Sequence, residues 1–325
     1  MADSTATSTS TYKTNFQKVM EFNRAFDMVP SEPKTYSCYC VDAIERIKIN
    51  PLKNVRKNIF TENPKIIKLR LDLIKEELEE LNVAIKENDI IEQRDACADI
   101  LYVVYGMADV LGISIDDVFH NNAKSSYFEY YRDIDSNKDN YRKYFENFID
   151  KFLGATDRET NTISNFNYIK HFTNELLRFN INDVVKEDLI ELIQNKLNTS
   201  YKTLETNCLI KFDYIPDSNY DMFRLEAISY NLYQLLKWAY MMTLVIGYDA
   251  DVDFAIVHDS NMSKLCDNED DAKATVADYE DKYKAGSSPY DSPYYYYLSD
   301  LNKWIVKNKS SGKAFKNIKY KKVAF

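Results

Sequence analysis

Two successive segments within residues 73–99, LIKEELEELNVAIKENDIIEQRDACAD, have the spacing of amphipathic helices with acidic residues beside their apolar faces. With about 100° of rotation per residue, four aliphatic side chains of the first segment form one stripe: Ile74, Leu78, Leu81 and Ile85. Glu77 and Glu80 flank this stripe, whereas Glu76 and Glu79 point toward solvent. The pattern constrains the chain to pack two helices so that carboxylates lie at their contact.

The next segment repeats the arrangement with Glu92, Asp95 and Asp99, which lie within about 60° of arc on the side that carries its aliphatic residues. Burying several unpaired carboxylates is very costly, so protons, basic partners or cations normally neutralise them. Arg70 and Arg94 are too few to balance five acids. Carboxylate ligands without His or Cys favour Mg²⁺ or Mn²⁺ over zinc, so we predict such a metal site. The alternative is a solvated helix face.

Composition narrows the class of protein. The 325 residues include only 6 Gly and 7 Pro, which are too few for the many turns of a protein with many strands, and this favours an all-α fold. The net charge of −9 argues against a general nucleic-acid-binding surface. Five cysteines without a C-x-x-C pair indicate reduced thiols, and the longest apolar run, 235–248, is too short to span a bilayer. We therefore expect a cytoplasmic protein, in the host cytoplasm if viral, without nucleic-acid or membrane partners.

Segments after residue 160 match segments before residue 125 in the same order. Three pairs align: 15–23 with 165–173, 73–88 with 192–207, and 99–119 with 234–254. Gly112 aligns with Gly247, and Phe119 aligns with Phe254. We interpret this as two tandem copies of one helical unit. The alternative is that amphipathic helices resemble one another because they share apolar spacing.

The two copies differ where the acids lie. The second copy places other residues at those positions: Asn195, Lys196, Thr199, Ala227, Tyr230 and Gln234. It cannot hold the same metals. The segment HDSNMSK (258–264) that closes it offers Asn261 and Lys264 for phosphate, where the first copy has HNNAKSS (120–126). We hypothesise one composite site per chain, with metal held by the first copy and phosphate by the second, and we expect Arg70 to contact the substrate as well.

These observations predict a helical bundle of two tandem four-helix-type repeats, the second without the acidic site. The expected parts are a disordered tail at 1–14, a metal-binding repeat at 15–125, a helical connector at 126–160, a degenerate repeat ending in a phosphate loop at 161–264, and an extension packed on the core at 265–325. The Tyr-rich stretch at 288–304 gives no interpretable pattern.

The acidic residues resemble the mark of the all-α nucleoside triphosphate pyrophosphohydrolase superfamily, the MazG-like, dimeric dUTPase-like and phosphoribosyl-ATP pyrophosphohydrolase-like group. That mark is E-x-x-E on one helix followed by E-x-x-D on the next. Glu77-x-x-Glu80 and Glu92-x-x-Asp95 fit it. A second register that starts at Glu76 is disfavoured by the helical phase.

Three further stretches resemble phage and viral members of this group: DILYVVYG from Asp99, SNMSK at 260–264 and SGKAFKNIKY at 311–320. Two features depart from the family pattern. Ala96 stands where many relatives have an acid, which leaves open whether Asp95, Asp99 or both bind metal. SNMSK also lies far from the acids in sequence, which an intervening duplication would explain.

The resemblance implies Mg²⁺-dependent hydrolysis of a nucleoside triphosphate to the monophosphate and pyrophosphate, in nucleotide-pool house-cleaning. It implies metal ligation by Glu77, Glu80, Glu92 and Asp95, with Asp99 a fifth ligand or an orienting residue. The alternatives are a phosphoribosyl-ATP pyrophosphohydrolase, a narrow dUTPase or dCTPase, a non-catalytic scaffold, and a slow nucleotide sensor. Family members build the site from two subunits, so either a homodimer or a duplication that replaces the dimer is expected.

Overall fold

The computed structural model describes residues 13–28, 55–56, 58–113, 115, 183–210 and 218–325. The elements in these residues are α1 (Asn15–Ala25), α2 (Ile59–Glu62), α3 (Pro64–Glu87), α4 (Ile90–Leu111), α9 (Asp183–Leu209), α10 (Ser218–Val245), α11 (Ala250–Met262), α12 (Glu269–Lys284), β1 (Pro293–Leu298) and β2 (Lys303–Asn308). The protein is mostly helical, as the all-α prediction requires, and the two strands form one antiparallel hairpin.

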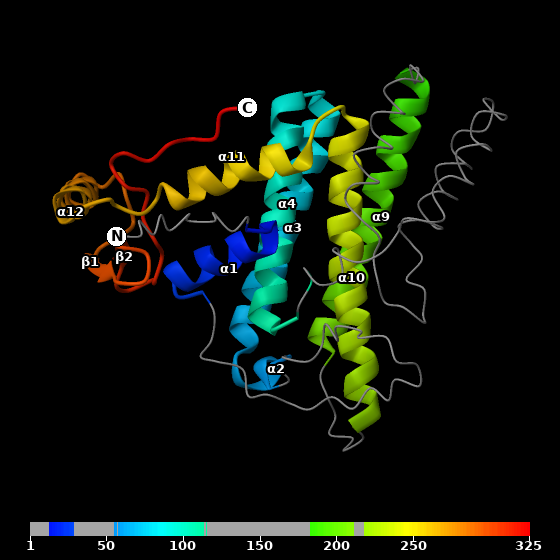
Figure 1. Ribbon diagram of the computed structural model, residues 1–325, viewed down its shortest axis with the longest axis horizontal. Coiled ribbons are helices and arrows are strands. Elements are labelled where there is room, and N and C mark those ends of the chain that lie inside the picture. The colour runs from blue at the N-terminus through cyan, green and yellow to red at the C-terminus, as the bar shows by residue number, and fades with distance from the viewer. Residues whose placement is uncertain (1–12, 29–54, 57, 114, 116–182, 211–217) are drawn as a thin grey trace, which may run out of the picture.

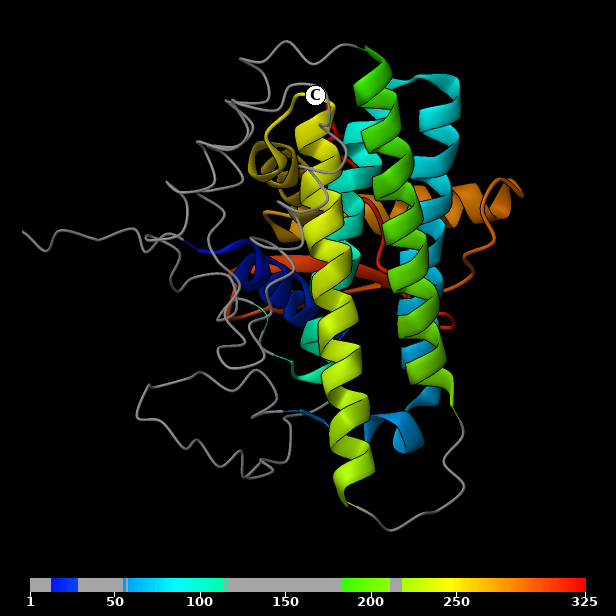
Figure 2. The same ribbon diagram turned by 90° about the vertical axis from the view of Figure 1, so that its right-hand side faces the viewer.

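Two long helical hairpins form the main bundle, one from α3 and α4 and the other from α9 and α10 (Figure 2). The hairpins meet mainly where α10 packs on α4, and α3 also touches α9. At that second contact Gln194 Nε2 donates to Asn82 Oδ1 at 3.0 Å. On another side of α4, α1 and α11 cross the bundle (Figure 1).

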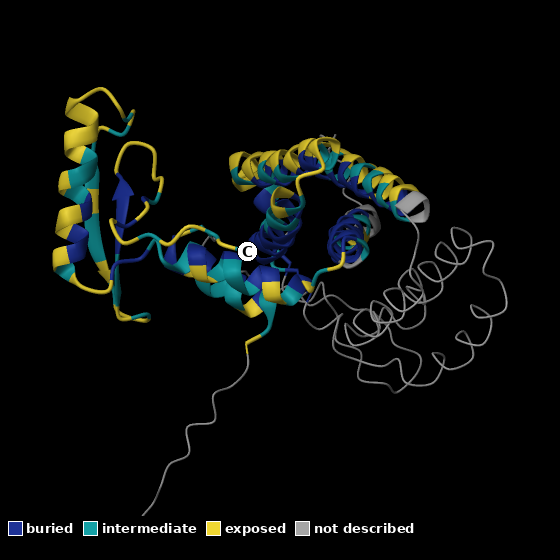
Figure 3. Cartoon of the chain, turned by 90° about the horizontal axis from the view of Figure 1, so that it is seen from above, coloured by how far each residue is buried: buried dark blue, intermediate teal, exposed yellow. Residues whose placement is uncertain are grey.

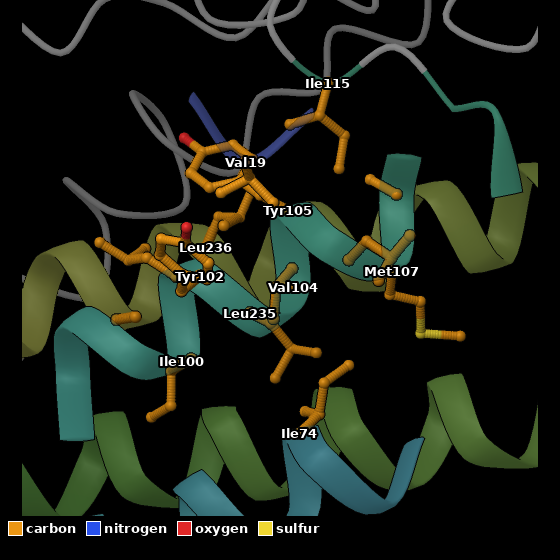
Figure 4. Packing of buried hydrophobic residues seen from close by; sticks show 14 of the residues in the cluster. Val19, Ile74, Ile100, Tyr102, Val104, Tyr105, Met107, Ile115, Leu235 and Leu236 are labelled. Carbon is orange, nitrogen blue, oxygen red and sulfur yellow. The ribbon is translucent and has the colours of Figure 1, made fainter. Parts of the chain in front are cut away.

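Helix α4 is the centre of the core because it packs against α1, α3, α10 and α11 at once. Its side chains are buried almost all round, including Val104 and Leu101 with no exposed surface. Figure 4 shows Val104 among Ile74 of α3, Leu235 of α10 and other apolar side chains. A helix enclosed in this way has few positions for polar groups. The acids on α4 therefore stand out as residues that need a separate explanation.

The turn between α3 and α4 fixes how the two acidic helices face each other. Asn88 takes the left-handed conformation at φ 53° and ends α3. Asp89 then caps α4, its Oδ1 accepting from the Ile91 and Glu92 amides at 3.0 and 3.1 Å. Gln93 Nε2 donates back to the Ala84 carbonyl at 3.2 Å. A short, fully bonded turn leaves little freedom in the register of the hairpin.

The C-terminal part adds a small unit of α12 and the β1–β2 hairpin, which lies at one end of the molecule (Figure 3). Its own buried cluster comprises Cys266, Ala272, Val306 and Phe315. The hairpin also contacts the end of α1, where Tyr296 and Lys307 both bond to Asp27. The Tyr-rich stretch at 288–304, which gave no sequence pattern, thus contains strand β1 and the first residues of β2.

The predicted duplication is compatible with the bundle but is not established by it. Both hairpins run in the same order, and the inner helix of each is followed by a glycine with positive φ, Gly112 at 72° and Gly247 at 97°. The predicted connector at 126–160 and the first helix of the second copy at 165–173 lie outside the described residues. The duplication and its domain boundaries remain predictions.

Three of the five cysteines fall in described positions, and Cys97, Cys208 and Cys266 are buried free thiols there. Within the part of the chain that the structure describes, none of the helices has the length and apolar character needed to cross a bilayer.

Candidate metal and phosphate site

The acids of α3 divide by helix face. Glu77 is half-buried beside α4, whereas Glu76 and Glu79 are exposed. Glu79 instead lies 3.5 Å from Lys75 Nζ on the solvent side. Glu80 also has an exposed side chain, one turn beyond Glu77 at the rim of the helix contact. The apolar stripe that sets this phase is buried as predicted, except that its last member is half-buried.

On α4, Asp95 and Asp99 are half-buried and Glu92 is exposed near the start of the helix. Asp95 Oδ1 is fully buried and has no hydrogen-bond partner in the described residues. A buried oxygen of this kind is costly unless a ligand or solvent satisfies it. The buried Asp95 oxygen is therefore the clearest indication that these acids bind a ligand from outside the chain.

The carboxylates are close enough to perturb one another. Burial raises the pKa of Glu77 to about 9, and repulsion from Asp99 and then Glu80 adds to the effect. Burial raises the pKa of Asp99 to about 7, with a further contribution from Asp95. The pKa of Asp95 is raised by burial and then by Glu92. The acids predicted on two separate helices thus form one electrostatically coupled cluster.

Arg94, next to Asp95 in sequence, already has an ion-pair partner on another helix. Its guanidinium makes two bonds to Asp253 of α11, at 3.1 and 2.6 Å. It also lies over the rings of Tyr248 and Phe325, 4.1 and 4.6 Å from their centroids. Arg94 therefore joins α4 to α11 and to the end of the chain, and its charge is matched by Asp253.

Arg70 does not have the position expected of a substrate-binding residue. Its side chain is buried, with Nη2 donating to Asn23 Oδ1 at 3.0 Å, and Asn23 Nδ2 donating to Asp109 Oδ2 at 2.8 Å. Gly106 makes room for it, because a Cβ there would lie 2.7 Å from Arg70 Nη1. Burial lowers the pKa of Arg70 to about 10, and Asp109 opposes that shift. Arg70 belongs to a buried polar network between α1, α3 and α4, and its predicted contact with the substrate remains a prediction.

Lys264 brings a positive charge to the acids from the far end of the sequence. It follows α11, and its Nζ donates to Asn261 Oδ1 at 2.5 Å and lies 5.7 Å from the Phe22 ring centroid. Burial lowers the pKa of Lys264 to about 8, and the nearby Asp99 carboxylate opposes this. The effect of Asp99 on Lys264 is in line with the composite site, which remains a prediction.

Helix α11 reaches this position by packing along α4. Tyr102, one turn after Asp99, has its hydroxyl 3.2 Å from His258 Nδ1, and its ring stacks on Phe254. Burial lowers the pKa of His258 to about 4, so the imidazole is neutral at physiological pH. This aromatic contact positions Lys264 and leaves no charge of its own beside the acids.

Two lysines near Lys264 were not predicted as site residues. Lys316 and Lys313 both lower the pKa of Lys264, after the larger effect of burial. The available signal was the SGKAFKNIKY segment, whose sequence resembled family members without indicating which residues mattered.

The donor set fits a hard divalent cation. All five acids offer oxygen ligands, and one buried oxygen of Asp95 lacks a partner. In the described residues, however, no three His, Cys, Asp or Glu side chains converge closely enough to hold one ion as they stand. Like charges without a counter-ion repel, which favours separated rotamers. For several of these carboxylates to bind one ion, their side chains have to rotate toward it.

Residues 41–126 match the phosphoribosyl-ATP pyrophosphohydrolase family, a stretch that contains α2, α3, α4 and all five acids. The chain is also 31% identical over 309 residues to uncharacterized protein L479 of Acanthamoeba polyphaga mimivirus, which covers 95% of this chain and 92% of that protein. No solved structure matches.

Proposed function

We propose that this chain, which belongs to the same protein family as mimivirus L479, is a Mg²⁺-dependent nucleoside triphosphate pyrophosphohydrolase. The proposal also rests on residues 41–126, which match the phosphoribosyl-ATP pyrophosphohydrolase family of the all-α superfamily. The reaction would convert the triphosphate and water to the monophosphate and pyrophosphate. The observation that supports this best is the coupled acid cluster with Lys264 beside Asp99. Such a site offers ligands for cations and a charge for phosphate together.

Four acids would hold the metal in this proposal: Glu77, Glu80, Glu92 and Asp95. Asp99, more deeply buried, would be a fifth ligand or would orient the others. Bound Mg²⁺, or Mn²⁺, supplies neutralisation of phosphate charge and a water of lowered pKa. The chain's own part is positioning: the bonded α3–α4 turn fixes the acids, while Asn261 and Lys264 hold phosphate oxygens.

A second candidate substrate is phosphoribosyl-ATP, favoured by the family that residues 41–126 match. Both candidates release pyrophosphate, so the acid cluster serves either reaction. A product assay with both compounds separates them.

The first test compares two neighbouring glutamates of α3. Glu80→Gln is expected to lose Mg²⁺-dependent release of pyrophosphate from a panel of ribo- and deoxyribonucleoside triphosphates, because it removes a ligand charge from the cluster. Glu79→Gln should keep it, because Glu79 is exposed and pairs with Lys75. Chromatography of the products gives the reaction and the preferred base. Equal activity of the two variants would contradict the assignment, and no turnover of any triphosphate by the wild type would favour phosphoribosyl-ATP or a binding role.

A pH profile tests Lys264. Its pKa is lowered to about 8, so the ammonium is present below that pH and is lost as pH rises through it. We expect the KM for the triphosphate to rise between pH 7 and pH 9.5. Lys264→Arg keeps its charge over this range, so its KM should change much less. Lys264→Ala should have a KM raised by about tenfold at pH 7, since a charge-assisted phosphate contact is worth about 1.5 kcal/mol. The KM of this variant should change little with pH, because the titrating ammonium is absent. A KM that is the same in all three proteins would exclude the phosphate-binding role.

A further inference from the structure

The segment 312–321, which follows the β hairpin, is fastened to the turn that carries Lys264. Asn317 Nδ2 donates to the Leu265 carbonyl at 2.9 Å. Further along, Ser260 Oγ donates to the Lys321 carbonyl at 2.8 Å. In Figure 1 the red end of the chain runs from the hairpin past α11 toward the start of α4, where the Phe325 ring lies against Arg94. The backbone around Asn317 and Lys321 is therefore held beside the turn that carries Lys264.

A buried aromatic ring anchors the middle of the segment. Phe315 is 2% exposed, and its ring stacks on Tyr279 with 3.8 Å between centroids. Its amide donates to the Val306 carbonyl of β2 at 2.8 Å. Lys313 and Lys316 lie on either side of this anchor. Their backbone is therefore fixed, whereas Lys316 and Lys313 themselves are exposed.

These two lysines have no ion-pair partner among the described residues, although neighbouring lysines do. Lys319 of the same segment pairs with Asp271 at 2.7 Å. Lys313 and Lys316 instead lie over tyrosine rings, with Nζ 5.1 and 4.6 Å from the centroids. The Asn317–Leu265 hydrogen bond joins the residues next to Lys316 and Lys264, so these two lysines lie in one region. Lys316 and Lys313 also lower the pKa of Lys264. Asp99 offsets the repulsion among these ammonium groups only in part, since the pKa of Lys264 stays lowered, and an anion bound between the lysines would offset it further.

We propose that Lys313 and Lys316 join Lys264 in a three-lysine cradle for the phosphate chain of the substrate, facing the acid cluster. The inference rests on the proposed function for the identity of the substrate. It goes further by making the C-terminal unit part of the binding site. Three cations suit a chain of several phosphates better than a single phosphate group, so the cradle favours triphosphates over monophosphates and promotes release of the monophosphate product.

The test measures binding of inorganic tripolyphosphate in the presence of Mg²⁺ by calorimetry, using the full chain. Lys313→Ala/Lys316→Ala should bind about tenfold more weakly than the wild type, since each exposed contact is worth up to about fivefold. The matched control is Lys309→Ala/Lys322→Ala, which removes two exposed lysines from the same C-terminal part of the chain. The control should stay within about twofold. All four lysines are exposed, and an unchanged unfolding midpoint would show that each variant is folded.

The outcomes separate this inference from the proposed function. Equal affinity of the Lys313/Lys316 variant and the wild type would overturn the cradle, as would no binding of tripolyphosphate by the wild type. Weakened binding in the variant, with no hydrolysis of any triphosphate by the wild type, would support the cradle and overturn the proposed enzyme. Hydrolysis by the wild type with the same KM in the variant would retain the enzyme and overturn the cradle.

Discussion

Replacing Asp95 by Asn is expected to remove Mg²⁺-dependent turnover and, at the same time, to stabilise the metal-free protein. One Asp95 oxygen is buried without a partner among the described residues, and burial and then Glu92 raise the pKa of this carboxyl. The amide removes a charge that folding otherwise has to bury. It is also a much weaker metal ligand, so kcat should fall by about a hundredfold or more, since metal-ion stabilisation of the transition state is worth several kcal/mol.

The stability part of this prediction has a definite pH dependence. A carboxyl whose pKa is raised by folding contributes stability at low pH, and that contribution is lost as pH rises through the folded value. The pKa of Asp99 is raised to about 7 and that of Glu77 to about 9. The metal-free wild type should therefore lose stability between about pH 4 and pH 9. Asp95→Asn weakens the repulsion within the cluster, so its advantage should grow across that window.

Thermal unfolding at pH 6 and pH 9, with and without Mg²⁺, gives the measurement. Each kcal/mol of stabilisation raises the midpoint by about 2–4 °C for a domain of about 150–250 residues. Mg²⁺ should raise the midpoint of the wild type much more than that of the variant. Asp72→Asn is the matched control, because Asp72 is exposed on α3 and pairs with Lys68 at 2.6 Å. A variant that is less stable than the wild type without metal, or one that still turns over, would contradict the assignment of Asp95.

The acidic half of the site was readable from sequence because its signal is local. Helical phase alone places Glu77 beside the Leu78 stripe and turns Glu79 away, and the structure has both in those positions. The αL Asn88 and the Asp89 cap complete a hairpin whose register depends on residues within one turn. Such features need no knowledge of the rest of the chain.

The rest depends on contacts between distant residues. Arg70 lies near the acids in sequence, but Gly106, 36 residues later, opens the space that buries it. The β1 strand has no alternation of polar and apolar residues, and its position follows from Tyr296 and Lys307 bonding to Asp27 of the α1 end. The Lys313 and Lys316 charges reach the site only because α11 and the C-terminal segment fold back together. No local pattern contains that information.

Replacing Arg70 by Met is expected to cost about 3–5 kcal/mol of unfolding free energy, the usual penalty for leaving a buried charge without its partner. The change keeps a long apolar stem but removes the donor to Asn23 and the positive charge that Asp109 faces. Asn23 and Asp109 would stay buried, with exposed fractions of 1% and 6%. Denaturant unfolding of both proteins measures the difference.

The same variant decides between the two roles considered for Arg70. If Arg70 is structural, the folded fraction of Arg70→Met at low temperature should keep the wild-type KM and the wild-type response to Mg²⁺, because the guanidinium bonds to Asn23 and not to the acids. If it binds substrate, the KM should rise while stability changes little. Lys68→Met, an exposed change on the same helix, should change the free energy of unfolding by no more than about 0.5 kcal/mol and leave the KM unchanged. A stable Arg70→Met protein with a raised KM would instead indicate that Arg70 binds the substrate, as the sequence predicts, and that the buried network contributes little to stability.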